Sequence, residues 1–246
     1  MSVFHNNILG GAAGQTGGAA AVEGPTKSLR FNSGDSAYLN RTPSSAGNRR
    51  KWTWAGWIKR SKLGAEDGVF SSYGTAHPNT AFVFNQDNTF QFHDFASGSF
   101  NFKLVSNRVL RDTSAWYHII VAVDTTQSIA AYRIRIYING TILSSSDYST
   151  AQWPSENFET DLNSATRTDV GHHAGVYFNG YMADIHFIDG QQLSNTDFGE
   201  FDNNGIWRPK EARFTNPNNE TTLSSGTQSI PDTTRPMYNL FNSSNN

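Results

Sequence analysis

The chain has 246 residues, a formal net charge of -2 and no cysteine, with 16% charged and 13% aromatic residues. The lack of cysteine excludes disulfides, thiolate metal sites and a thiol nucleophile, and the charge offers no excess of Lys or Arg to neutralise a phosphate backbone. The first residues, MSVFHNNILGG, have neither the basic start of a signal peptide nor a long apolar run. We therefore expect no nucleic-acid partner and no membrane partner.

Residues 1–26 are predicted to form an extended arm. Positions 8–24 are almost entirely Gly and Ala and have no large periodic face, so they cannot bury enough surface to order themselves alone. Such a thin arm could lie along a neighbouring subunit. We expect it to act as an assembly anchor through Phe4, Ile8 and Leu9.

From Leu29 onward, short segments of alternating large apolar and polar residues are separated by Gly, Asn, Asp, Ser and Pro. Regularly spaced short strands of this kind predict an all-β fold, a two-sheet antiparallel sandwich, over residues 27–202. The clearest predicted strands are 52–59, 67–73, 81–85, 89–95, 100–105, 116–124, 132–139 and 181–188.

The stretch 116–140, WYHIIVAVDTTQSIAAYRIRIYING, predicts an antiparallel hairpin. Its first strand is apolar on nearly both faces, as in the centre of a sheet, and Asp124–Ser128 supplies the turn. In 132–139 the alternation places Tyr132 and the isoleucines toward the core, and Arg133 and Arg135 toward solvent.

A helical turn is predicted at Leu193–Phe198, with Ser194 as its cap and Asp197 reaching back to the amide of Ser194. The periodicity then fades. Residues 203–246 are rich in Asn, Thr, Ser and Pro and are expected to form an irregular tail, with Trp207 as a further assembly anchor.

Three motifs in order resemble a known family: WYHIIV at 116–121, IYING at 136–140, and FNGYMADI at 178–185 before Leu193-Ser194. Together they are similar to the concanavalin A-like jelly roll in its laminin G/pentraxin form. The resemblance implies a jelly-roll sandwich with a structural role for His118. We expect Trp57 and Trp116 to fill the space between the sheets, and Gly180 to let the last strand pass closely.

The flanks carry a narrower resemblance. The Gly-rich leader, Phe201-Asp202 and the run GIWRPKE at 205–211 are similar to virion structural proteins of marine tailed bacteriophages. This implies a non-enzymatic protein located in the virion, as a capsid decoration or part of a tail fibre. Other virion proteins and further copies of the chain, as a homo-oligomer, are the implied partners.

Endoglucanases of the same superfamily carry Glu-x-Asp-x-x-Glu on one strand. Here Glu159-Thr160-Asp161 lacks the second glutamate, so we interpret both carboxylates as loop residues and predict no catalytic residue. His172 and His173 are adjacent and would point to opposite faces of a strand, which does not favour a shared metal.

Laminin G relatives often bind Ca²⁺ through loop oxygens, and Asp94, Asp124 and Asp169 would be the candidates. No stretch has the spacing of a calcium loop, so no metal site and no cofactor is predicted. A glycan could bind to aromatic residues in or near loops, namely Trp153, Tyr177 and Phe95. Two alternatives to the virion role stay open: a free carbohydrate-binding lectin and, less favoured, a glycan hydrolase.

Overall fold

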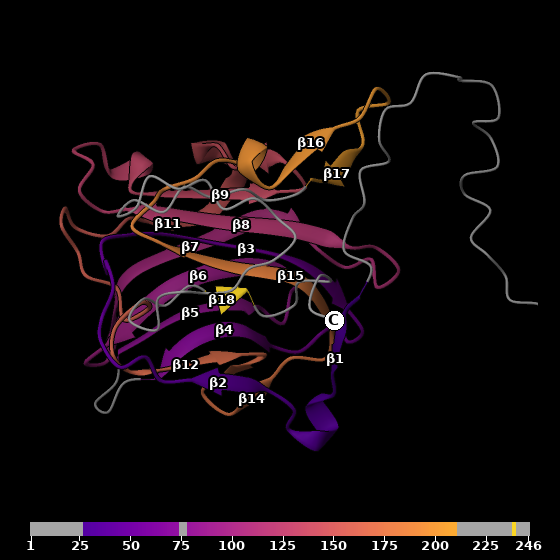
Figure 1. The fold of residues 1–246 in the computed structure, drawn as a ribbon, viewed down its shortest axis with the longest axis horizontal. Coiled ribbons are helices and arrows are strands. Elements are labelled where there is room, and N and C mark those ends of the chain that lie inside the picture. Colours follow the sequence, from indigo (N-terminus) through magenta and orange to yellow (C-terminus); the bar gives the residue numbers. More distant parts are fainter. Residues whose placement is uncertain (1–26, 74–77, 211–237, 240–246) are drawn as a thin grey trace, which may run out of the picture.

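The computed structural model describes residues 27–73, 78–210 and 238–239. Two large antiparallel sheets are stacked in it, as Figure 1 shows. The predicted two-sheet jelly-roll sandwich is therefore confirmed. The predicted arm, with Phe4, Ile8 and Leu9, and most of the predicted tail lie outside the described residues.

The first sheet has the order β1-β15-β3-β8-β9-β10, and β18 also pairs with β15. Its strands are β1 (Leu29–Phe31), β3 (Lys51–Arg60), β8 (Tyr117–Asp124), β9 (Ile134–Ile138), β10 (Thr141–Ile142), β15 (Gly180–Asp189) and β18 (Tyr238–Asn239).

The second sheet has the order β11-β7-β6-β5-β4-β12-β2. Its strands are β2 (Leu39–Arg41), β4 (Asp67–Tyr73), β5 (Pro78–Phe84), β6 (Thr89–Ala96), β7 (Ser99–Val109), β11 (Tyr148–Gln152) and β12 (Arg167–Val170).

Two small hairpins and four single turns of 3₁₀ helix complete the described fold. The hairpins are β13 (His172–His173) with β14 (Val176–Tyr177), and β16 (Gly199–Phe201) with β17 (Trp207–Pro209). The helical turns are η2 (Ser33–Asp35), η3 (Ala130–Tyr132), η4 (Ser145–Asp147) and η5 (Asn195–Asp197). The last of these has the predicted cap, since Ser194 and Asp197 form a reciprocal capping box.

Aromatic side chains dominate the core between the sheets. Trp52 stacks on Phe187 at 5.3 Å between ring centres, and Phe82 meets Phe92 edge-on at 4.7 Å. Edge-to-face and offset-stacked pairs are the favoured geometries for such rings. The core is therefore built from large rings that each sheet contributes at alternate positions.

The prediction for the tryptophans of this core was wrong. Trp52 and Trp54 are fully buried between the sheets, whereas Trp57 is half-buried on the opposite face of β3, where it stacks on His118 at 4.7 Å. Trp116 is half-buried just before β8. The reason for Trp57 is the pleat of β3, because within this strand only residues an even number of positions from Trp52 share its face.

The β8–β9 hairpin is confirmed, with Val121 opposite Ile136, but its start differs from the prediction. Ala130–Tyr132 form a 3₁₀ turn, so β9 begins only at Ile134. As a result Tyr132 is 48% exposed and Arg133 only 9% exposed. The Arg133 guanidinium donates to the carbonyls of Gln127, Ser128 and Pro154. It therefore holds two loops together instead of facing solvent, while Arg135 lies over the Tyr132 ring.

The predicted irregular tail begins with regular structure. β17 pairs with β16, with Phe201 opposite Trp207, and Trp207 is buried at 8% exposure. The prediction failed here because a three-residue strand whose one large apolar side chain is buried shows no periodicity.

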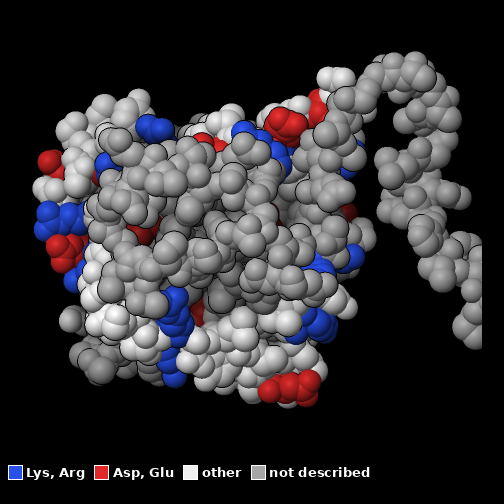
Figure 2. All heavy atoms as spheres, in the orientation of Figure 1, with Lys and Arg blue, Asp and Glu red and all other residues white. Residues whose placement is uncertain are grey.

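None of the described helices is long and apolar enough to cross a membrane. On the face drawn in Figure 2, basic and acidic side chains are interspersed around the margin of the described surface.

Candidate functional site

The outer face of the second sheet, directed away from the core, combines polar and aromatic side chains. Phe90 and Phe92 of β6 belong to the core, so Gln91 and His93 point outward. The register extends this face across neighbouring strands. One row runs Ala81, His93, Lys103 and Gln152, and the next runs Val83, Gln91, Val105 and Thr150.

Beside the exposed Thr150 and Gln152, this face carries a small platform formed by Phe95, Phe100 and Lys103. All three side chains are half-buried. The two phenylalanine rings meet edge-on at 5.0 Å, and the Lys103 ammonium group lies 4.5 Å from the centre of the Phe100 ring. A bulge of β7 between Phe100 and Phe102 brings Phe100 opposite Phe95.

The β13–β14 hairpin packs on β4 at the other side of this face. The backbone of the hairpin packs directly on Gly68, which has no side chain. A Cβ at this position would lie 2.4 Å from the amide nitrogen of His173 and 2.6 Å from the carbonyl oxygen of Val176. Ser71 of β4 donates to the carbonyl of His172 at 2.8 Å. These contacts bring the His173 ring to 5.3 Å from the His93 ring.

Both imidazoles are neutral at physiological pH. Burial lowers the pKa of His93 to about 3, with smaller contributions from His173 and Lys103. Burial and the neighbouring His172 lower the pKa of His173 to about 4. The amide of Gln91 donates to Nδ1 of His93 at 2.9 Å, which leaves the ring proton on Nε2.

Two of the three residues predicted to contact sugar lie on this side of the molecule. Phe95 belongs to the platform, and Tyr177 lies on β14 with its ring 4.7 Å from His172 and 6.0 Å from Tyr38. Trp153 is placed elsewhere, half-buried against the core and 5.5 Å from the Tyr148 ring.

The residues missed at the level of sequence are Gln91, His93, Phe100, Lys103 and His173. The signal for two of them was present in FQFHDF at 90–95, because Phe90 and Phe92 in the core require Gln91 and His93 outside. Lys103 has the same kind of signal, because it lies between the core residues Phe102 and Leu104. Phe100 depends on a bulge and His173 on a hairpin folded over the sheet, and neither has a sequence signal.

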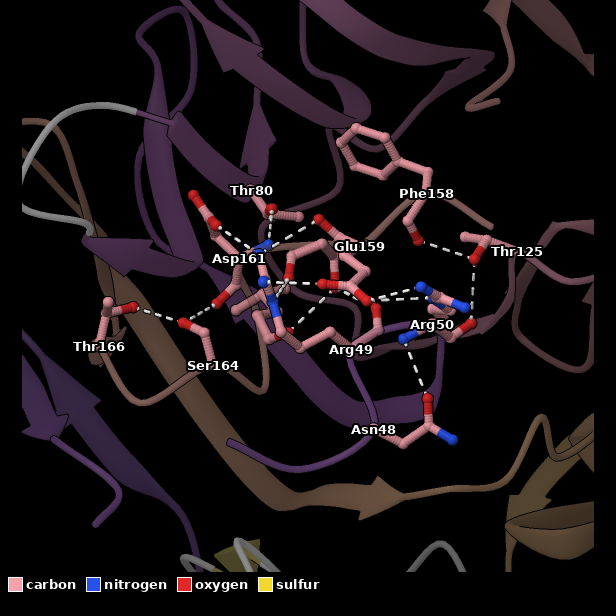
Figure 3. A network of polar contacts seen from close by, with 12 residues as sticks. Asn48, Arg49, Arg50, Thr80, Thr125, Phe158, Glu159, Asp161, Ser164 and Thr166 are labelled. Atoms are coloured by element: carbon pink, nitrogen blue, oxygen red, sulfur yellow. Dashed lines mark hydrogen bonds and ion pairs between the residues drawn. The ribbon is translucent and has the colours of Figure 1, made fainter. Parts of the chain in front are cut away.

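A network of polar contacts lies elsewhere, at the end of the sandwich where the loop 153–166 meets the start of β3 (Figure 3). Arg49 pairs with Glu159 at 3.1 Å and with Asp161 at 3.0 Å, and Arg50 pairs with Glu159 at 2.8 Å. The amide of Asp161 donates to the hydroxyl of Thr80 at 2.8 Å. This network ties the loop to the sheets.

One carboxyl of the network is perturbed. Burial and the nearby Asp94 raise the pKa of Asp161 to about 6, against the opposing effect of Arg49. A raised pKa is a property of general acids, but the Asp161 side chain is only 14% exposed and lies under Arg49. Both Glu159 and Asp161 are thus held in ion pairs with Arg49.

The three calcium candidates do not come together as a donor set. Asp94 accepts from Thr80 and Asn101, Asp124 pairs with Lys51 at 2.9 Å, and Asp169 pairs with Arg167 and His172. Within the described ranges, no three His, Asp or Glu side chains are grouped so that they could hold a metal ion. These residues therefore do not fit a calcium site.

Trp207 and His118 meet on the outer face of the first sheet. The Trp207 indole packs against Gly140 and Gly199 and also contacts the His118 ring, which is 2% exposed. Burial lowers the pKa of His118 to about 3. The structural role predicted for His118 is confirmed. Trp207, predicted as an assembly anchor, is placed within its own chain.

Two antiparallel sheets around an aromatic core, with the capped turn after the last long strand, define a jelly roll of the lectin type. The chain belongs to the concanavalin A-like lectin/glucanases superfamily, whose laminin G-type sequence profile matches residues 32–197. By that description the superfamily includes both lectins and glycan-cleaving enzymes. No curated protein matches the chain.

Solved structures similar in fold include a heptameric SAP-like pentraxin from Limulus polyphemus, with 15% identity and a TM-score of 0.47 over 70% of this chain and 76% of the pentraxin. Domain 4 of an extracellular arabinanase from Geobacillus stearothermophilus, in complex with arabinotriose, has 15% identity and a TM-score of 0.45 over 62% of this chain and 66% of that domain. Mouse laminin α1 domains LG4-5 have 10% identity and a TM-score of 0.43 over 65% of this chain and 40% of the laminin.

Proposed function

We propose that the chain is a non-enzymatic carbohydrate-adhering protein displayed on the particle of a tailed phage. The observation that carries the glycan-binding part is the platform of Phe95, Phe100 and Lys103, with Gln91 and His93 behind it. Aromatic rings offer the apolar faces of sugars a flat contact, and nearby amide, imidazole and ammonium groups donate to hydroxyl oxygens.

The virion part of the proposal rests on the resemblance of the leader and of GIWRPKE at 205–211 to virion structural proteins. A particle that displays many copies gains avidity from a weak single site. A small half-exposed platform is adequate for such a role, because tight binding by one copy is not required.

The non-enzymatic part is supported by the Arg49–Glu159–Asp161 network. A retaining glycosidase needs two carboxyl groups that face the substrate, about 5–5.5 Å apart. Here Glu159 and Asp161 are both paired with Arg49. We expect no product release from polysaccharides that the protein binds, and release abolished by D161N or E159Q would contradict this part.

Binding is tested with the full chain on immobilised polysaccharides of different composition, comparing wild type with F100A and with F201A. Phe201 is 50% exposed on β16, away from the platform, and serves as the matched control. Saturable binding that F100A abolishes and F201A retains is the expected result. Absence of binding to every polysaccharide would overturn the proposal of glycan adhesion.

The virion role is tested separately by locating the chain in intact particles by cryo-electron microscopy, and by deleting residues 1–24. We expect deletion to abolish incorporation. A truncated protein that still decorates particles would contradict the anchoring role of the arm.

A further inference from the structure

The groups that act electrostatically on His93, beside the platform, are basic. The charged or titratable groups that act on His93 are Lys103 of β7 and His173 of β13, while its sequence neighbour Asp94 lies on the opposite face and accepts from Thr80 and Asn101. No carboxylate of the described chain pairs with Lys103. A ligand that enters here therefore meets one ammonium group and two imidazoles.

A second, independent feature is a buried ring nitrogen of His173 that has no hydrogen-bond partner. His173 is 8% exposed, and its Nδ1 has no hydrogen-bond partner among the residues that the structure describes. A buried nitrogen without a partner carries a desolvation cost. A bound anion removes this cost when Nδ1 of His173 carries the ring proton, because an anion accepts a hydrogen bond and cannot donate one.

The hairpin that carries His173 is fixed in place by hydrogen bonds of the adjacent His172. His172 bonds to Asp169 at 2.7 Å through its Nδ1, and its Nε2 accepts from the amide of Gly175 at 3.1 Å. Both ring nitrogens of His172 therefore have hydrogen-bond partners within the fold. The ring of His173 lies instead next to that of His93.

We propose that the glycan recognised by this platform is anionic, and that a carboxylate or sulfate group of the sugar binds between Lys103, His93 and His173. This inference rests on the proposed glycan binding and specifies its ligand class. An anion pairs with Lys103 without displacing a protein carboxylate, accepts from Nε2 of His93, and makes the protonated forms of both histidines less costly. A neutral sugar gains only the ring contacts and hydroxyl hydrogen bonds.

The test compares three polysaccharides with the full chain at low ionic strength: a polyuronate for carboxylate, dextran sulfate for sulfate, and unmodified dextran as the neutral reference. We expect at least one anionic polymer to bind about tenfold more tightly than dextran, as one charge-assisted contact would give. The preference between the first two identifies the anion. Binding should weaken as salt is added.

The variants K103Q and K62Q separate this site from general attraction. Both remove one positive charge, but Lys62 is exposed in the loop between β3 and β4. K103Q should lose the anionic preference while K62Q keeps it. Histidine resonances give a further readout, because a bound anion raises the pKa of His93 and His173 and leaves that of His118 unchanged.

Equal affinity for dextran and both anionic polymers, or equal losses in K103Q and K62Q, would overturn the anionic ligand class while leaving glycan binding intact. Absence of binding to all three polymers and to the wider polysaccharide set would instead remove the proposed glycan binding itself, and this inference with it.

Discussion

Trp207 donates its indole N–H to Nδ1 of His118 at 3.1 Å, across 89 positions of sequence. The histidine ring contacts two tryptophans, with ring centres 4.7 Å apart for Trp57 and 5.9 Å apart for Trp207. This contact fixes the β16–β17 hairpin on the outer face of the first sheet, so the described fold extends beyond residue 197, the end of the family match.

The first prediction concerns this bond. W207F keeps an aromatic ring but leaves Nδ1 of His118 buried without a donor, so it should lower the free energy of unfolding by about 1–3 kcal/mol. Trp153 is half-buried, and W153F is the matched control with a smaller expected loss. Urea unfolding followed by circular dichroism measures both. Equal losses would mean that ring volume, not the hydrogen bond, stabilises the hairpin.

The second prediction concerns pH. Burial lowers the pKa of His93 and His118 to about 3 and that of His173 to about 4, from an ordinary value of 6.5. Between these values the unfolded chain binds more protons than the folded protein, so stability rises with pH from about 4 to about 6.5. Urea midpoints across this range should increase with pH, and H118Q should reduce the slope. A flat profile would contradict the neutral, buried state of these histidines.

Asp161 opposes that trend, which gives a third prediction. Its pKa is raised to about 6, so between about 4 and 6 the folded protein binds the extra proton and the contribution of Asp161 to stability falls as pH rises. D161N should therefore steepen the overall increase of stability with pH. R49M removes the positive partner and should raise the Asp161 pKa further, measured by carboxyl carbon NMR. A titration near 4 in the wild type would show that the Arg49 pair outweighs burial.

The fourth prediction concerns the buried ion pair of Arg60 and Asp67, which are 0% and 1% exposed with Nη2 and Oδ2 3.0 Å apart. R60M leaves the Asp67 carboxylate buried and unpaired, with an expected loss of about 3–5 kcal/mol. The double variant R60M/D67L should recover much of it, because no charge is then buried. Denaturant unfolding at pH 7 compares the two, and a double variant no more stable than R60M would argue against this account.

The fifth prediction concerns Gly180, where a Cβ would lie 2.2 Å from the carbonyl oxygen of Lys59. G180A must separate β15 from β3 at this point and should cost about 1–3 kcal/mol. At Gly34 the nearest atom to a Cβ is 3.4 Å away, in the Asn32 side chain, so G34A is a control with little expected effect. Thermal unfolding distinguishes them.

The sequence was sufficient for the sandwich because alternation has a period of two and the core residues are large. All eight predicted strands are present, and Asp67–Tyr73 has the predicted bounds. One failure occurred where a local turn interrupts the alternation. Arg133 continues the pattern of the strand that follows it, but the preceding 3₁₀ turn makes it the cap of that turn and directs its guanidinium into the loops.

The platform was only partly predictable from sequence. Phe95 and Tyr177 could be singled out as aromatic residues near loops, but their neighbours come from strands distant in sequence. His93 meets His173 only because β12 places the β13–β14 hairpin next to β4, and such a tertiary contact is not encoded in local periodicity. The use of Phe95, Tyr177 and Trp153 in sugar binding stays a prediction.

Gly68 sets how closely the β13–β14 hairpin approaches the second sheet. Since the backbone of the β13–β14 hairpin approaches within 2.4 Å of where a Cβ would be, the missing side chain sets the height at which His173 stands above the sheet. A single methyl group at this position would move the hairpin away from the sheet and increase the distance between the His173 and His93 rings. The identity of residue 68 therefore controls the distance between His173 and His93, and we expect related proteins that differ only there to hold the same two histidines at a different spacing.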